Sequence, residues 1–161
     1  MRTTKVKKVL IALDYDPTAQ KVAEAGYSLA KTMEAEIILL HVIYDPLQYV
    51  SEKHFTVMGF AGYKNTVPLI IDGVDELKRE SQRFLDKSKQ HLGDKTIQTI
   101  VKEGKLAESI LATAKELHSD LIIMGSHSRR WMEKIILGSV AEKVLLHTTI
   151  PLLIIPTKKQ K

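Results

Sequence analysis

The chain has 161 residues, of which 44% are hydrophobic and 27% are charged, a composition typical of one soluble globular domain that buries a sizeable core. The formal net charge is +5, but seven basic residues lie at the two ends and the rest of the chain carries −2, which disfavours nucleic acid as a partner. The lack of cysteine excludes disulfides, thiolate metal sites and a cysteine nucleophile, and it fits a reducing compartment, so we expect a cytoplasmic protein.

Five short runs rich in Val, Ile and Leu predict five β-strands. They cover residues 6–13, 36–43, 96–101, 120–124 and 151–156. Most of these runs are continuous rather than alternating, which is typical of parallel strands buried on both faces. The first run is too short for a secretory signal, and none approaches the roughly 18 apolar residues of a membrane span, so we expect no membrane association.

Helical patterns separate the strands. The first helix is expected to begin at Pro17 with Asp16 as its N-cap, since both residue types are favoured at these positions. The stretches 74–92 and 105–118 place apolar residues on one face. This alternation predicts right-handed crossovers and one α/β domain over residues 1–161, an open, doubly wound, five-stranded parallel sheet with helices on both faces. The strand order that we expect for this sheet is 3-2-1-4-5.

The connection formed by residues 44–73 is far longer than the usual two to six residues of a strand-to-helix loop. It contains two prolines, three glycines and five aromatic residues. A lid over a site, a subunit contact and a surface excursion all remain open as interpretations.

Two strand ends carry residues suited to a ligand. Ligands of open doubly wound sheets bind beyond the carboxyl ends of the strands, where the strand order reverses. In the expected order, Asp14 and Gly125 follow neighbouring strands and face one crevice. Gly138 and Ser139 then begin a helix whose free N–H groups suit a phosphate. Ser139 and Glu142 also fit a capping box, which needs no ligand, so both interpretations stay open.

Ser126, His127 and Asp14 raise the alternative of a Ser-His-Asp hydrolase. This alternative is disfavoured, because the chain has no G-x-S-x-G turn and because adjacent Ser and His on a loop seldom reach the geometry of nucleophilic catalysis. The other histidines lack metal-ligand spacing and are expected at the surface or partly buried. They are His41, His54, His91, His118 and His147.

Nearly the whole chain resembles the universal stress protein family, and residues 103–156 resemble the family's C-terminal half. The family's nucleotide motif, G-x2-G-x9-G-S/T, falls on Gly125, Ser128, Gly138 and Ser139 with both spacings kept. "VLIALDYDPTAQKVAEAGYSLA" resembles the family's first strand, its terminal aspartate and the following helix, and "ILLHVI" resembles the second strand. The resemblance implies a Rossmann-like fold of the adenine nucleotide alpha hydrolase type and a site for ATP, accompanied by Mg²⁺.

Site residues follow from the resemblance position by position. The adenosine end would lie on Ala12, Leu13, Asp14 and Val42. The ribose and phosphates would lie along Met124, Gly125, Ser126, His127, Ser128, Arg129, Gly138, Ser139 and Val140. Ser128 stands where the motif has its second glycine, and Asp16 stands where the family commonly has a serine that Asp16 can replace as a helix cap. The resemblance also implies a homodimer through the last strand, residues 151–156.

The implied function is that of a regulatory, ATP-binding protein of the stress response. The alternative is a dimeric interaction protein of the same fold that binds no nucleotide, and Ser128 is the residue that discriminates between the two. A nucleotide-hydrolysing enzyme is disfavoured beyond slow hydrolysis, because no general base is evident other than Asp14 and His127.

Overall fold

The protein is described here by a computed structural model that covers residues 5–44, 74–126 and 137–157. Five parallel strands form one sheet in the order β3-β2-β1-β4-β5, which confirms the predicted topology. The strands are β1 (Lys8–Ala12), β2 (Glu36–Ile43), β3 (Gln98–Glu103), β4 (Leu121–Gly125) and β5 (Leu152–Ile155). The helices are α1 (Ala19–Thr32), α3 (Val74–Leu92), α4 (Leu106–Glu116) and α5 (Ser139–His147). The long connection predicted at residues 44–73 lies, from residue 45 on, outside the described residues.

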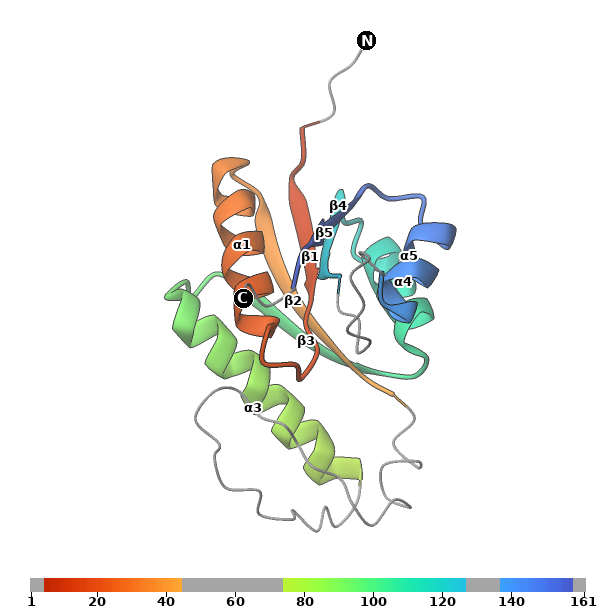
Figure 1. The fold of residues 1–161 in the computed structure, drawn as a ribbon. Coiled ribbons are helices and arrows are strands. Elements are labelled where there is room, and N and C mark those ends of the chain that lie inside the picture. Colours follow the sequence, from red (N-terminus) through yellow and green to blue (C-terminus); the bar gives the residue numbers. More distant parts are fainter. Residues whose placement is uncertain (1–4, 45–73, 127–136, 158–161) are drawn as a thin grey trace.

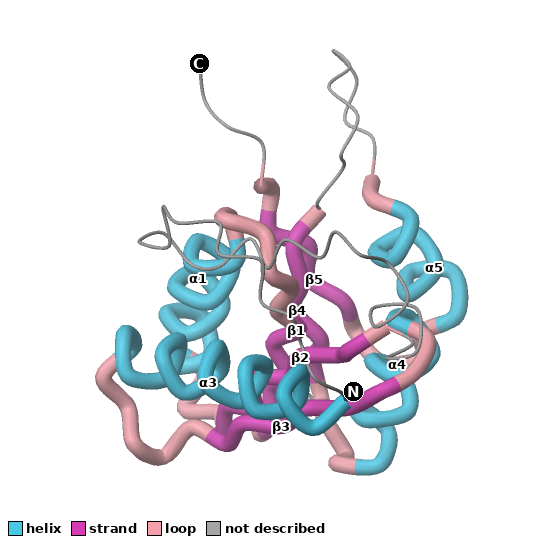
Figure 2. Tube along the Cα trace, turned by 90° about the horizontal axis from the view of Figure 1, so that it is seen from below, coloured by secondary structure: helices cyan, strands magenta, loops and turns pink. Residues whose placement is uncertain are grey.

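The sheet separates two apolar cores. Helices α1 and α3 cover one face and α4 and α5 cover the other, as Figure 1 and the rotated view in Figure 2 show. Successive residues of a strand point to opposite faces, so Ile11 and Leu39 pack under α1 and α3, whereas Leu10 and Leu40 pack under α4 and α5. Burial on both faces explains why the central strands read as continuous apolar runs.

Helix α1 begins at Ala19, two residues later than predicted. A tight turn precedes it, in which the Ala19 N–H donates to the Asp16 carbonyl at 2.9 Å. The N-cap is Thr18 and not the predicted Asp16; Asp16 closes the preceding turn, because its Oδ1 accepts the Thr18 N–H at 2.9 Å. The sequence therefore predicted the helix but placed its N-cap and first turn two residues too early.

Strand β3 also starts two residues later than predicted. The Oδ1 of Asp94 accepts the backbone N–H of Thr96 at 2.9 Å, which closes a local turn after α3. Ile97 follows this turn as a buried residue of the α1/α3 core, and strand pairing begins at Gln98. Within the described part of the chain, no helix has the length and apolarity needed to cross a membrane.

Candidate functional site

The carboxyl ends of β1 and β4 lie side by side. The two strands pair in parallel, with Ile11 opposite Ile123. The Leu13 N–H donates to the Leu40 carbonyl at 2.8 Å, so the backbone of the β1 segment stays in the sheet one residue beyond its assigned end. Side chains that directly follow β1 and β4 therefore emerge at one edge of the sheet, as predicted from the strand order.

Asp14 is exposed at this edge. Its Oδ1 accepts the Asp16 N–H at 3.1 Å, and among the residues that the structure describes its Oδ2 has no hydrogen-bond partner. A carboxylate with an unoccupied oxygen can accept hydrogen bonds from hydroxyl or amine groups of a ligand.

Three predicted site residues share the α4/α5 face of the sheet. Ala12, Val42 and Met124 stand near the carboxyl ends of β1, β2 and β4 and belong to one apolar cluster, in which Val42 and Met124 are buried. Leu13 lies elsewhere: its side chain is buried in the core under α1 and α3. The structure thus brings together an apolar floor of three residues, and Leu13 contributes its backbone to this edge.

Packing alone requires glycine at position 125. A Cβ there would lie 2.8 Å from Cγ2 of Thr157 and 3.0 Å from Cγ2 of Val22. These atoms belong to the segment after β5 and to α1, so the end of β4 is held between two layers of the fold. A ligand is not needed to explain this glycine.

Ser126 ties the end of β4 to two other segments. Its carbonyl accepts the Gly138 N–H at 2.8 Å, and its own N–H donates to the Ile155 carbonyl at 2.9 Å. Its Oγ accepts the Thr157 N–H at 3.1 Å, so this hydroxyl supports the chain after β5. The hydrolase alternative gains no support from such a serine.

The bond between Ser126 and Gly138 joins the described residues on either side of the rest of the predicted motif. His127, Ser128 and Arg129 lie outside the described residues.

Helix α5 starts without a side-chain cap. Gly138 is the N-cap and Ser139 is the first helical residue, so the capping-box interpretation of Ser139 and Glu142 is wrong: the pair is shifted by one residue from the required positions. Ser139 is exposed and Val140 is half-buried. The first-turn N–H groups and the positive end of the helix dipole lie at Ser139, an arrangement suited to an anion.

His41 corrects a second expectation, because it is only 4% exposed. Burial lowers the pKa of His41, and a backbone hydrogen bond to Leu13 and the charge of Asp14 oppose this shift. The Nδ1 atom lies 2.8 Å from the Leu13 carbonyl oxygen, and because a carbonyl only accepts, Nδ1 carries the proton. The sequence signal for this burial was a single polar residue inside the apolar run 37–43.

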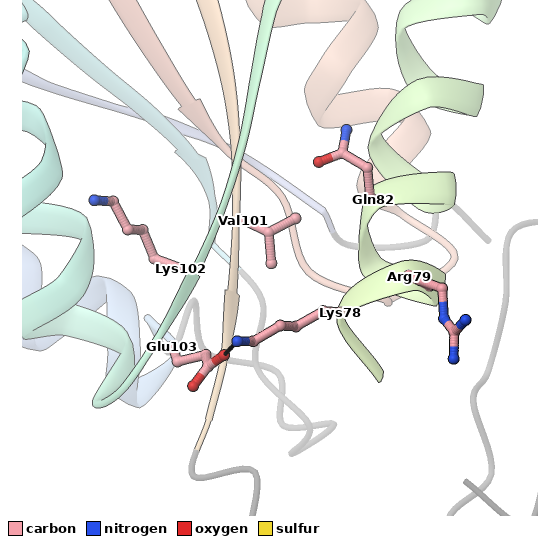
Figure 3. A pocket seen from close by; sticks show the side chains of 6 residues that line it. All are labelled: Lys78, Arg79, Gln82, Val101, Lys102 and Glu103. Carbon is pink, nitrogen blue, oxygen red and sulfur yellow. Dashed lines mark ion pairs between the residues drawn. The ribbon is translucent and has the colours of Figure 1, made fainter. Parts of the chain in front are cut away.

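A surface groove lies between α3 and the carboxyl-terminal half of β3, two strands away from β1 (Figure 3). Each of its basic side chains is paired with a carboxylate: Lys78 with Glu103 at 2.6 Å, Arg79 with Glu76 at 2.8 Å, and Lys102 with Glu116 at 3.4 Å. In Figure 3, Arg79 and Lys102 point away from the groove. Because these charges are already compensated, the groove is a poorer candidate for an anionic ligand than the edge near Asp14.

The model of the universal stress protein family matches residues 5–156. The chain belongs to this family. It is 32% identical to universal stress protein YxiE of Bacillus subtilis over 151 residues, which are 92% of this chain and 97% of the relative. It is also 32% identical to universal stress protein MJ0577 of Methanocaldococcus jannaschii over 157 residues, which are 94% of this chain and 96% of the relative.

Solved structures share the fold. A structure of MJ0577 has a TM-score of 0.69 at 26% identity and covers 98% of this chain and 100% of its own. A crystal structure of a universal stress protein in complex with cAMP has a TM-score of 0.64 at 15% identity, with 96% and 100% coverage. A universal stress protein of Archaeoglobus fulgidus in complex with dAMP has a TM-score of 0.58 at 15% identity, with 94% and 98% coverage.

Proposed function

We propose that this universal stress protein binds an adenine nucleotide, ATP, at the carboxyl ends of β1 and β4 and acts as a regulatory protein of the stress response. The observation that carries the proposal is the 2.8 Å hydrogen bond between the Gly138 N–H and the Ser126 carbonyl. This bond holds the start of α5, which has no side-chain cap, next to the end of β4. Strand β4 pairs with β1, the strand that leads to Asp14. The complexes of two structural relatives with cAMP and dAMP support the choice of an adenine nucleotide.

In this proposal the two ends of the ligand meet different chemistry. The adenosine lies against the apolar floor of Ala12, Val42 and Met124, and Asp14 accepts a hydrogen bond from a ribose hydroxyl or the adenine amine. The phosphates face the start of α5, where free N–H groups and the helix dipole favour negative charge.

Magnesium would accompany the phosphates. The described residues contain no group of three or more His, Asp or Glu side chains that could hold a metal ion. Mg²⁺ commonly keeps several waters and binds substrate phosphates. A Mg²⁺ ion held chiefly by phosphate oxygens and water fits this set of side chains.

A calorimetric titration with ATP tests the proposal. Asp14→Ala should weaken ATP binding roughly ten- to a hundredfold, which corresponds to the loss of one charge-assisted hydrogen bond. Glu36→Ala is the matched control. Glu36 is an exposed carboxylate at the amino end of β2, whereas Asp14 follows the carboxyl end of β1. An Asp14→Ala protein that is folded and binds ATP as wild type does would remove Asp14 from the site. A wild type that binds no ATP would favour the alternative, a dimeric interaction protein of the same fold.

We also propose that the chain forms a homodimer through residues 151–156. The two edge strands of the sheet, β3 and β5, differ in how well they are protected against pairing with a strand of another chain. Edge strand β3 carries Lys102 and Glu103, both in ion pairs, and charges discourage strand addition. Edge strand β5 has the apolar sequence LLII, and its residues are only partly buried in the single chain. Antiparallel pairing with a second copy would cover this edge, and Pro151 and Pro156 would limit the ladder to about four residues.

A further inference from the structure

Both neighbours of Asp14 are tied to one buried cluster. The Nδ1–H of His41 donates to the Leu13 carbonyl oxygen at 2.8 Å. The ring of Tyr15 packs on the His41 imidazole with their centroids 4.3 Å apart, and its hydroxyl lies 2.6 Å from Oγ of Ser81. Asp14 is therefore an exposed residue between two anchored ones.

The cluster itself is held by two elements, β2 and α3. His41 comes from β2, and Ser81 and Phe84 are buried residues of α3. The Phe84 ring packs edge-on against Tyr15 and His41, at centroid distances of 5.0 and 5.5 Å. These contacts restrict the rotamers of the two anchoring side chains, and the hydrogen bond to Leu13 orients the peptide plane that leads into Asp14.

We propose that His41 and Tyr15 are positioning residues, which hold the β1–α1 connection so that the Asp14 carboxylate is already directed toward the ligand. This inference rests on the proposed nucleotide site. Without the two anchors the connection would sample several conformations, and binding would have to order it at a cost in entropy. With the two anchors the β1–α1 connection is ordered when the protein folds, so ligand binding does not bear this entropy cost.

Titrations of His41 variants with ATP and with adenosine test the inference. His41→Leu should weaken both ligands by about the same factor, roughly tenfold, since the adenosine end is common to both. His41→Asn is the matched control: its side-chain amide places an N–H donor near the position of Nδ1 and should bind both ligands within about threefold of wild type. A histidine with only a structural role would change stability and leave the affinity of the folded protein unchanged.

A double-mutant cycle asks whether His41 acts through Asp14. In the Asp14→Ala background, His41→Leu should cause no further loss of affinity, because the group that it positions is gone. Additive losses would overturn the inference, and so would a His41→Leu protein that binds as wild type does.

Hydrogen exchange at the Asp16 amide provides a readout that needs no ligand. This N–H donates to Oδ1 of Asp14, so its exchange should accelerate in His41→Leu and remain slow in His41→Asn. If His41→Leu does not fold, Tyr15→Phe keeps the aromatic ring, removes the hydroxyl that lies 2.6 Å from Oγ of Ser81, and should accelerate the same exchange. Unchanged exchange in the folded variants would count against the anchors.

If wild type binds neither ATP nor adenosine, the proposed function and this inference fail together. If wild type binds these ligands and substitutions of His41 do not change their affinity, only the inference is refuted.

Discussion

Replacing Gly125 by alanine should destabilise the fold by about 1–3 kcal/mol, the usual cost of forcing one extra methyl group into a packed site. The new Cβ would lie 2.8 Å from Cγ2 of Thr157 and 3.0 Å from Cγ2 of Val22, inside the normal contact distance for both. Both are branched side chains close to the backbone, so neither atom can yield without moving its own segment. For a chain of this length the loss corresponds to about 2–4 °C in melting temperature for each kcal/mol.

Urea unfolding followed by far-UV circular dichroism measures this loss, and two variants sharpen it. Gly26→Ala is the control, because its Cβ would meet Cδ1 of Ile11 at 2.9 Å, the end of a flexible side chain, and alanine is favoured in a helix interior. Thr157→Ser removes the clashing methyl and keeps the hydroxyl. In the double variant with Gly125→Ala it should recover part of the stability as a coupling energy above about 0.5 kcal/mol. A Gly125→Ala protein as stable as wild type would refute the packing argument.

Three further predictions concern the fold and its assembly. The free energy of unfolding should fall as the pH drops below 6.5, the ordinary pKa of histidine, because burial lowers the pKa of His41 in the folded state and the unfolded chain therefore binds the proton more tightly. His41→Asn should flatten this pH dependence, measured by urea unfolding between about pH 7 and 5. Ser126→Ala should cost about 1–3 kcal/mol, since the Thr157 N–H loses its acceptor, and a loss below about 0.5 kcal/mol in the same assay would contradict that role. Leu153→Lys should convert the proposed dimer to a monomer in light scattering, whereas Gln98→Lys on the β3 edge should leave the assembly unchanged.

The order of elements and the sheet topology were predictable from the sequence. Five apolar runs alternating with helical patterns specify a parallel sheet, and the order 3-2-1-4-5 agrees with the structure. The hydrophobic periodicity of a segment is a local property of the chain, so it can be identified without knowing which other segments pack against it. Element ends were less predictable: the turns at Asp16 and Asp94 delay α1 and β3 by two residues each, because side-chain hydrogen bonds compete there with the regular pattern.

Residue roles at the candidate site depended on contacts between distant parts of the chain. Gly125 was predicted as a ligand residue, and the structure adds a steric need for glycine imposed by Val22 and by Thr157, 103 and 32 positions away in the sequence. His41 was expected at the surface or partly buried, yet it is almost fully buried because it lies under α3 and beside Leu13. The sequence by itself determined where the apolar runs of the strands and the apolar faces of the helices lie along the chain. Only the tertiary structure decided which of them meet, because such contacts join segments that the chain brings together only when both layers of helices pack on the sheet.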